Sequence, residues 1–242
     1  MQSDLPKVVF PVGGRAMVCA VVDACLAAGC GRVIVVVGHK QELVRDALWS
    51  YVQQGQVEFA VQEPQLGTGH AVACASPLIG AETGHNVFVL CGDGPLIRAR
   101  TLLAVLERHR TTGAQATLAT AELDDPSGYG RILRDQNGRF GGIVEEKNAT
   151  PEQLRIREVN PSYYCFDAGA LLAALPRVKH NAASGEYYLT DVPELLAKDG
   201  CTVEVVEAVS PEDVLSINTP ADLARVDAMY RARQATAPGK VG

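Results

Sequence analysis

The sequence predicts an α/β fold, a three-layer sandwich in which helices cover both faces of a mixed, mainly parallel sheet. Short apolar runs without polar alternation, such as Val33 to Val37 and Val87 to Cys91, are typical of strands buried on both faces. Segments with helical apolar spacing separate these runs, and this rhythm favours parallel neighbouring strands. With 242 residues, of which 47% are hydrophobic and 21% charged, the chain has the size and composition of one globular domain.

The first half of the chain carries the alternation of helices and strands. Apolar residues at helical spacing predict a helix from Ala16 to Ala28, which Gly29 ends. After it we expect a strand at 33–37, a helix at 41–52, a strand at 57–61, a helix from the end of the loop 62–69 to about residue 78, the strand at 87–91, and a helix at 100–111. This half supplies the parallel part of the predicted sheet.

The second half departs from the alternation. Asn137-Gly138 is a strong hairpin signal between two short strands, and turn residues at 124–128 precede it. Strands are expected at 116–123, 158–167 and, as an exposed edge, 202–209, with helices at 168–175 and 190–197. Thr219-Pro220 predicts the start of a final helix that ends near Arg233. We therefore expect one domain over residues 1–234 and a flexible tail over 235–242.

Charge and composition exclude several classes of function. With 22 basic and 28 acidic residues, the net charge of −6 provides no global basic field to attract nucleic acid. No apolar run approaches the roughly 20 residues of a membrane span, and the N-terminus has no signal-peptide pattern. We expect a cytoplasmic protein with neither a nucleic-acid nor a membrane partner, and the sequence leaves the oligomeric state open.

Cysteines and histidines show no metal-binding or catalytic spacing. The seven cysteines, at positions 19, 25, 30, 74, 91, 165 and 201, form no CxxC pair and mostly lie in apolar segments, so buried free thiols are expected. The five histidines, at positions 39, 70, 85, 109 and 180, are scattered, which favours structural or solvated roles. No GxSxG nucleophile motif, phosphate loop of the GxxxxGK[ST] type or GxGxxG fingerprint with its acidic partner occurs.

Two segments carry residues suited to a ligand. Asp93 follows a buried strand directly, at the edge where open α/β sheets bind ligands, so it is a candidate metal ligand or ribose-binding group. An aspartate there can equally cap a turn or the next helix. The loop Gln65 to Gly69 precedes a helix, and its two glycines permit close approach of the backbone to a ligand. A plain turn capped by Thr68 is the alternative.

A series of motifs that spans nearly the whole chain resembles the sugar-nucleotide pyrophosphorylase family. The resemblance is greatest to the N-terminal uridylyltransferase domain of bacterial bifunctional N-acetylglucosamine-1-phosphate uridylyltransferases. It implies a Rossmann-like nucleotide-diphospho-sugar transferase fold. The matching blocks, in order, are SDLPKV (3–8), GRAM (14–17), QEPQLGTGHA (62–71), GDGPL (92–96), DDPSGYGRI (124–132), GIVEEKNAT (142–150), EVN (158–160), GEYYLTD (185–191) and IN (217–218).

The resemblance also implies a reaction and its residues. The reaction is transfer of UMP from UTP to a sugar 1-phosphate, with N-acetylglucosamine 1-phosphate as the leading acceptor, Mg²⁺ as cofactor and pyrophosphate as the second product. By resemblance, catalysis falls to Lys7 and Asp93, metal binding to Asp93 and Asn218, uracil recognition to Gln62, Gly67 and Thr68, and the sugar side to Gly130, Glu145, Asn160, Tyr187 and Thr190.

The chain departs from the family pattern in three places. A strand and the glycine-rich loop LAAGxGTRM should come directly before Ser3, so we expect the first strand of the sheet to be missing and the start codon to have been assigned too late. Pro161-Ser162 stand where the family has Thr-Gly after Asn160, which bears on the acceptor sugar. The sequence ends before an acetyltransferase domain, so neither acetyl transfer nor the trimer that this domain brings is expected.

Two other functions stay open at this point. One is a different hexose-1-phosphate uridylyltransferase or thymidylyltransferase, with another base or sugar preference. The other is a noncatalytic domain that binds or senses nucleotide sugars, which the absence of the glycine-rich loop favours. Pyrophosphate release separates both from the leading hypothesis, because it reports on turnover and on substrate choice.

Overall fold

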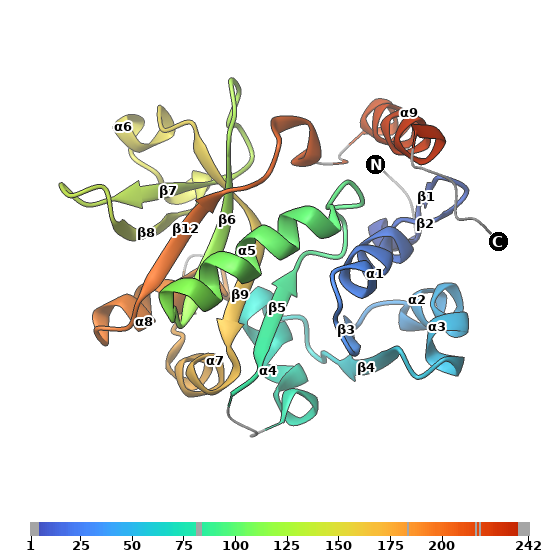
Figure 1. Cartoon of the computed structure of the whole chain (residues 1–242), viewed down its shortest axis with the longest axis horizontal. Helices are drawn as coiled ribbons and strands as arrows, with labels where there is room; N and C mark the ends of the chain where they lie inside the picture. The colour runs from blue at the N-terminus through green and yellow to red at the C-terminus, as the bar shows by residue number, and fades with distance from the viewer. Residues whose placement is uncertain (1–4, 81–83, 183, 216, 218, 237–242) are drawn as a thin grey trace.

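The computed structural model of the chain describes residues 5–80, 84–182, 184–215, 217 and 219–236. Helices cover both faces of a central sheet, as Figure 1 shows. The helices are α1 Met17–Ala27, α2 Gln41–Ala47, α3 Trp49–Gln53, α4 Thr68–Ile79, α5 Ala99–Thr112, α6 Pro151–Leu154, α7 Ala168–Ala174, α8 Asp191–Lys198 and α9 Pro220–Thr236. Short 3₁₀ helices are η1 Lys7–Val9, η2 Glu146–Asn148, η3 Leu175–Arg177 and η4 Pro211–Asp213. None of the helices described here has both the length and the apolar character that crossing a membrane requires.

The sheet is mixed, as the sequence predicts, although most described strand pairs of its main part are antiparallel. The strands are β1 Pro11–Val12, β2 Arg15–Ala16, β3 Val33–Val37, β4 Val57–Val61, β5 Asn86–Leu90, β6 Ala116–Glu122, β7 Gly130–Arg134, β8 Phe140–Val144, β9 Glu158–Asp167, β10 His180–Asn181, β11 Glu186–Tyr187 and β12 Val203–Glu207. The main sheet has the order β12-β6-β9-β7-β8, and β5 also pairs with β9. The pairs β12–β6 and β3–β4 are parallel, and β12 lies at the edge as expected.

Strand β9 divides the sheet. One edge of β9 pairs along its length with β6, while the other edge pairs with β7 near Asn160 and with β5 from Tyr163 onward. Two residues of β9 lie between the segments that pair with β7 and with β5. Pro161 has no N–H to donate, and Ser162 has a φ of +63°. The register with β6 shifts at the same place. The sheet therefore splits beside Asn160, and a split of this kind creates a crevice for ligands.

Two layers of helices pack on opposite faces of this sheet. Because side chains alternate along a strand, Tyr164 and Phe166 of β9 face a core formed with α4, α7 and α8. Tyr163 and Cys165, also on β9, face the core formed with α1 and α5. Both cores contain apolar residues that are almost completely buried. This arrangement confirms the predicted three-layer sandwich.

The helix predicted at 41–52 is interrupted. It forms two helices, α2 and α3, which meet at Leu48, where φ is −104° and ψ is 7°. The sequence there has neither glycine nor proline, so local signals predict one continuous helix. The Leu48 side chain is fully buried against the β3–β4 pair, and this tertiary packing accompanies the break.

The final helix begins as predicted and ends later than predicted. Thr219 and Asp222 cap it reciprocally, because Asp222 N donates to Thr219 Oγ1 and Thr219 N donates to Asp222 Oδ2. The helix continues to Thr236, whose hydroxyl donates to the carbonyl of Ala232. The first two residues of the predicted tail are therefore helical, and the rest of that tail, 237–242, lies outside the described residues.

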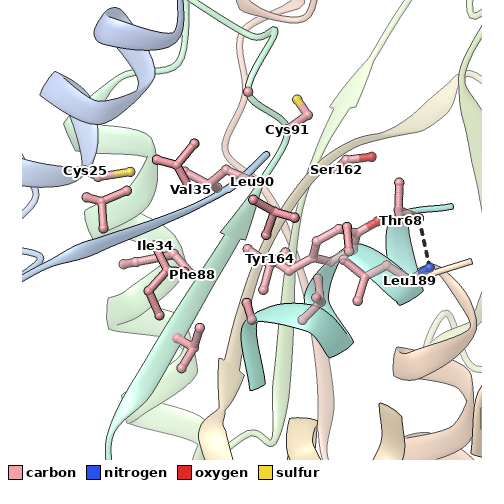
Figure 2. Close-up of a pocket in the computed structure, with 18 of the residues that line it drawn as sticks. Cys25, Ile34, Val35, Thr68, Phe88, Leu90, Cys91, Ser162, Tyr164 and Leu189 are labelled. Atoms are coloured by element: carbon pink, nitrogen blue, oxygen red, sulfur yellow. Dashed lines mark hydrogen bonds between the residues drawn. The ribbon is translucent and has the colours of Figure 1, made fainter. Parts of the chain in front are cut away.

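A gap separates β3 from β5. Among the described strands, β3 pairs only with β4, and β5 pairs only with β9, so each has an edge that no described strand covers. A cavity of about 1450 Å³ extends between them, and apolar side chains from both strands line it. Figure 2 shows Ile34, Val35, Phe88 and Leu90 on its walls. No backbone pairing between described strands therefore joins the β3–β4 pair to the main sheet.

Candidate active site

An ion pair joins the two residues that the resemblance assigns to catalysis. Lys7 lies in η1, and its Nζ is 2.7 Å from Oδ2 of Asp93, which follows β5. Each of the two side chains is 35% exposed. Glycine is needed at Gly94 because a Cβ there would collide with the hydroxyl of Tyr163. The fold thus brings a cation and a carboxylate that are 86 positions apart to the carboxyl end of β5.

Gln62 is held at the carboxyl end of β4 with its side chain in a fixed orientation. Its Nε2 donates to the carbonyl of Gly67 at 2.9 Å and lies 3.1 Å from Nδ1 of His70. The residue is 7% exposed, and it lines the cavity. Since both contacts use the amide nitrogen, the amide oxygen of Gln62 is the atom positioned to accept a hydrogen bond from a ligand.

The loop before α4 packs closely against the β11 region. Gly67 is the N-cap of α4 with a φ of 94°, and a Cβ at this position would lie 2.7 Å from the carbonyl oxygen of Tyr187. Tyr187 N donates to the carbonyl of Leu66 at 2.8 Å. Thr68 does not cap the helix; its hydroxyl accepts a hydrogen bond from Leu189 N at 3.0 Å, drawn in Figure 2. The predicted cap by Thr68 is therefore wrong.

Glu145 is a partly buried carboxyl group in the cavity wall. The hydroxyl of Thr190 donates to Glu145 Oε1 at 3.2 Å. Burial raises the pKa of Glu145, while the hydrogen bond from Thr190 and the charge of Lys147 oppose that rise. Gly130 packs closely against Ile143, because a Cβ there would lie 3.1 Å from Cγ2 of Ile143, whereas its distance of 3.6 Å from Glu145 Oε2 would be an ordinary contact.

Asn160 is buried and internally bonded. It pairs with Gly130 across β9 and β7 and is only 5% exposed. Its Nδ2 donates to the hydroxyl of Tyr164 at 2.6 Å, and its Oδ1 accepts from Ser162 N at 3.1 Å. Both Tyr164 and Ser162 line the cavity, so Asn160 supports the wall from behind.

The cavity brings together half of the predicted site. Its walls include Gln62, Gly67, Thr68, Glu145 and Thr190. Next to the walls lie Asp93, Gly130, Asn160 and Tyr187, which contact wall residues or follow them directly in the chain, and Lys7 is paired with Asp93. The predicted metal ligand Asn218 lies outside the described residues. Segments that are distant in sequence therefore converge on one space.

Several residues in or next to the site are not among the predicted site residues. His70 lies in the first turn of α4, where its Nδ1 is 3.1 Å from Nε2 of Gln62, and local spacing did not predict this contact. Tyr164 and Ser162 form the wall in front of Asn160, and the departure Pro161-Ser162 pointed to this position. Nζ of Lys147 lies 5.0 Å from the centre of the Tyr188 ring. No local sequence pattern predicts this cation–π contact.

These features define a class of protein. The site combines the fixed amide of Gln62, the partly buried carboxyl group of Glu145 and the Lys7–Asp93 ion pair on a Rossmann-like sheet. The family model described as nucleotidyl transferase matches residues 2–233, and the chain belongs to this family.

The curated relatives are more specific. The bifunctional protein GlmU of Exiguobacterium sibiricum is 43% identical over 233 residues, which are 96% of this chain and 51% of that protein. GlmU of Geobacillus thermodenitrificans is 45% identical over 233 residues, 96% of this chain and 50% of that protein. The chain thus spans about half the length of these relatives, consistent with their N-terminal uridylyltransferase domain alone. The resemblance drawn from the motifs is confirmed.

Solved structures support the fold. Apo UDP-glucose pyrophosphorylase superposes with a TM-score of 0.73 at 17% identity and covers 95% of this chain and 92% of its own. A putative glucose-1-phosphate thymidylyltransferase from Bacillus anthracis, in complex with a sucrose, superposes with a TM-score of 0.72 at 20% identity, covering 93% and 86% of the two chains. The Rossmann-like α/β fold is therefore shared with sugar nucleotidyltransferases.

Proposed function

We propose that this domain transfers UMP from UTP to N-acetylglucosamine 1-phosphate and releases pyrophosphate. The observation that carries the proposal is the cavity on which Gln62, Thr68, Glu145 and Thr190 converge. The GlmU relatives favour N-acetylglucosamine 1-phosphate among sugar phosphates. We also place the reaction in the cytoplasm.

The base side of the site is formed by the loop before α4. Uracil presents a ring N–H between two carbonyl groups, so it needs one acceptor flanked by donors. The amide oxygen of Gln62 supplies the acceptor. The hydroxyl of Thr68 accepts from Leu189 N and keeps its own hydrogen for donation. The missing side chain at Gly67 lets the base approach the backbone.

The sugar side of the site is formed by Glu145 and its neighbours. An ionised carboxylate in a partly dehydrated pocket is a strong acceptor for sugar hydroxyls. The hydrogen bond from Thr190 engages Glu145 Oε1, and Oε2 lies on the side of Gly130. Asn160 contacts the sugar in this proposal, for which its amide must exchange its bonds to Tyr164 and Ser162 for bonds to the ligand.

Mg²⁺ fits the phosphate side of the site by its donor chemistry. Asp93 offers a partly exposed carboxylate at the strand end, and no group of three or more metal-ligating side chains occurs among the described residues. Mg²⁺ prefers oxygen ligands, keeps several waters and is shared with substrate phosphates, so it does not require a cage of protein ligands. When bound, it would neutralise phosphate charge; Asp93 would hold it, together with Asn218.

The protein groups act by position and charge. An oxygen of the sugar phosphate attacks the α-phosphorus of UTP, the new P–O bond forms, and pyrophosphate leaves with the bonding electrons. Lys7 holds phosphate charge, and the carboxylate of Asp93 keeps the lysine at the strand end until nucleotide arrives. Catalysis then rests on orientation and electrostatic stabilisation.

Asp93→Asn tests the proposal, with Asp46→Asn, an exposed carboxylate on α2, as the matched control. We expect Asp93→Asn to lower pyrophosphate release with UTP, N-acetylglucosamine 1-phosphate and Mg²⁺ by on the order of 10²-fold or more. The control should retain full activity, and circular dichroism should show both variants folded. Full activity in Asp93→Asn would refute the role of Asp93. A wild-type chain that binds UDP-N-acetylglucosamine without turnover would instead favour a noncatalytic binding domain.

A further inference from the structure

Cys25 and Cys30 form a contact pair at the carboxyl end of α1. The helix ends in a Schellman motif: Cys30 N donates to the carbonyl of Cys25 at 3.1 Å, Gly29 N donates to that of Leu26 at 3.0 Å, and Gly29 has a φ of 89°. In a Schellman motif, the two residues joined by the first of these hydrogen bonds, here Cys30 and Cys25, usually also touch through apolar side chains. Here the two touching side chains are both thiols.

The pair is accessible from the cavity between β3 and β5. Cys25 is buried and Cys30 is half-buried, and both line this cavity. Figure 2 shows Cys25 on the same wall as Ile34 and Val35. All seven cysteines of the chain are free thiols, as predicted. A small polar oxidant that enters the cavity therefore meets two adjacent sulfurs.

The two thiols differ in acidity because they interact. The thiol of Cys25 donates a hydrogen bond to the Cys30 thiolate, which lowers the pKa of Cys30 to about 7. The same interaction, together with burial, raises the pKa of Cys25. Cys30 is thus the nucleophile of the pair, and Cys25 retains its proton until a second step needs it.

We propose that Cys25 and Cys30 are a redox modification site, which a peroxide oxidises to a disulfide. The Cys30 thiolate attacks one peroxide oxygen, so that an S–O bond forms, the O–O bond breaks and hydroxide leaves to become water. The Cys25 sulfur then attacks the resulting sulfenic acid, an S–S bond forms, the S–O bond breaks, and water leaves with the proton of Cys25. Two thiols lose two electrons, and one peroxide becomes two waters.

The bond would link two elements of the fold. It closes a short loop from the last turn of α1 to the segment that leads into β3. A short loop removes little chain entropy, so the disulfide is expected to be readily reversed by thiol reductants. This reversibility suits a protein of the reducing cytoplasm, where disulfides are usually transient.

Peptide mapping of the whole chain tests the proposal without any variant. The protein is treated with one equivalent of hydrogen peroxide, alkylated, and digested with trypsin and with a protease that cleaves before aspartate. Cleavage before Asp23 and after Arg32 yields a peptide whose cysteines are Cys25 and Cys30 alone, separate from Cys19. We expect this peptide to lack two hydrogens and both alkyl groups, and dithiothreitol to restore both alkylation sites.

Rates and variants complete the test. A lowered pKa gives Cys30 more thiolate but lower nucleophilicity, so Cys30 should oxidise about 10-fold faster than the half-buried control Cys201. In Cys25→Ser, the sulfenic acid on Cys30 should persist and react with dimedone. Oxidation of Cys30 at the rate of Cys201, or a disulfide from Cys25 to Cys19, would overturn the proposal.

Discussion

Glu145 shows how its surroundings set the chemistry of one residue. Its carboxyl group lies in the cavity wall, where burial disfavours the charged form and raises its pKa. The carboxylate must nevertheless be ionised to accept a sugar hydroxyl. The hydrogen bond from Thr190 and the charge of Lys147 support the ionised form. The group therefore loses its charge at a higher pH than an ordinary glutamate does.

The Michaelis constant for the sugar 1-phosphate should depend on this ionisation. As the pH falls through the raised pKa of Glu145, the constant should rise, because the protonated carboxyl accepts poorly. Glu145→Gln should remove this pH dependence and raise the constant by about 10- to 100-fold, the value of one hydrogen bond to a charged group. Steady-state kinetics between acid and neutral pH measure both effects.

The pH dependence of folding stability tests the raised pKa of Glu145 independently of activity. Because the folded-state pKa is raised, ionisation opposes folding above that pKa, and this cost disappears as the pH falls through it. Glu145→Gln should therefore unfold at a temperature no lower than the wild type at neutral pH. Glu152→Gln, on the exposed face of α6, is the control. An unchanged Michaelis constant in Glu145→Gln would contradict the assigned role.

The motif order predicted residue identities better than their contacts. It brought Gln62, Thr68 and Glu145 to one site, and the cavity does contain all three. The ion pair of Lys7 with Asp93 and the internal bonds of Asn160 were not predictable, since they join segments far apart in the chain. Local spacing carries no information about such pairs.

At the scale of elements, α4 depends on the glycines at its two ends. Gly67 and Gly80 have φ angles of 94° and 82° and ψ angles of 179° and 153°, a region that is open essentially only to glycine. They differ in their surroundings. A Cβ at Gly67 would meet the Tyr187 carbonyl at 2.7 Å, whereas a Cβ at Gly80 would meet nothing within 4 Å. A side chain at Gly80 would therefore cause backbone strain alone, whereas one at Gly67 would cause both backbone strain and a steric collision.

Gly67→Ala and Gly80→Ala form a matched pair for this reason. Each should lose about 1–3 kcal/mol of unfolding free energy from backbone strain. Gly67→Ala should lose about 1–3 kcal/mol more from the collision with Tyr187, and its affinity for UDP should fall with it. Urea unfolding and calorimetry measure these differences. Equal losses in the two variants would show that the contact between the loop and β11 contributes nothing.

Element types were largely predictable because they follow local patterns. Strand β9 has its predicted bounds, and the Thr219 cap was expected from Thr-Pro. The break at Leu48 and the close packing on Gly67 were not, because both result from tertiary contacts. The sheet order was also beyond the sequence, since β9 changes partner at Pro161.

At the scale of the whole molecule, we expect local stability to be lower around β3 and β5, whose edges no described strand covers, than around β6 and β9. The β6 and β9 strands are paired on both edges and buried between helices. By contrast, β3 and β5 border the large cavity, where their side chains are only half-buried. Backbone groups at such edges have fewer partners and open more easily.

Hydrogen exchange should reveal this difference. Amides of β3 and β5 that point to the cavity should exchange at least about 100-fold faster than amides of β6 and β9, because they open without global unfolding. Mass spectrometry of the exchanged native chain measures the rates by segment. Equal protection of β5 and β6 would mean that the edge of β5 is covered in solution.

The most direct test of the central claim is pyrophosphate release by the wild-type chain with Mg²⁺, measured for UTP, dTTP and CTP against several sugar 1-phosphates. We expect the highest kcat/KM for UTP with N-acetylglucosamine 1-phosphate, through the base contacts of Gln62 and the sugar contacts of Glu145. A higher kcat/KM for another pair, or no turnover with any pair despite binding of UDP-N-acetylglucosamine, would contradict it.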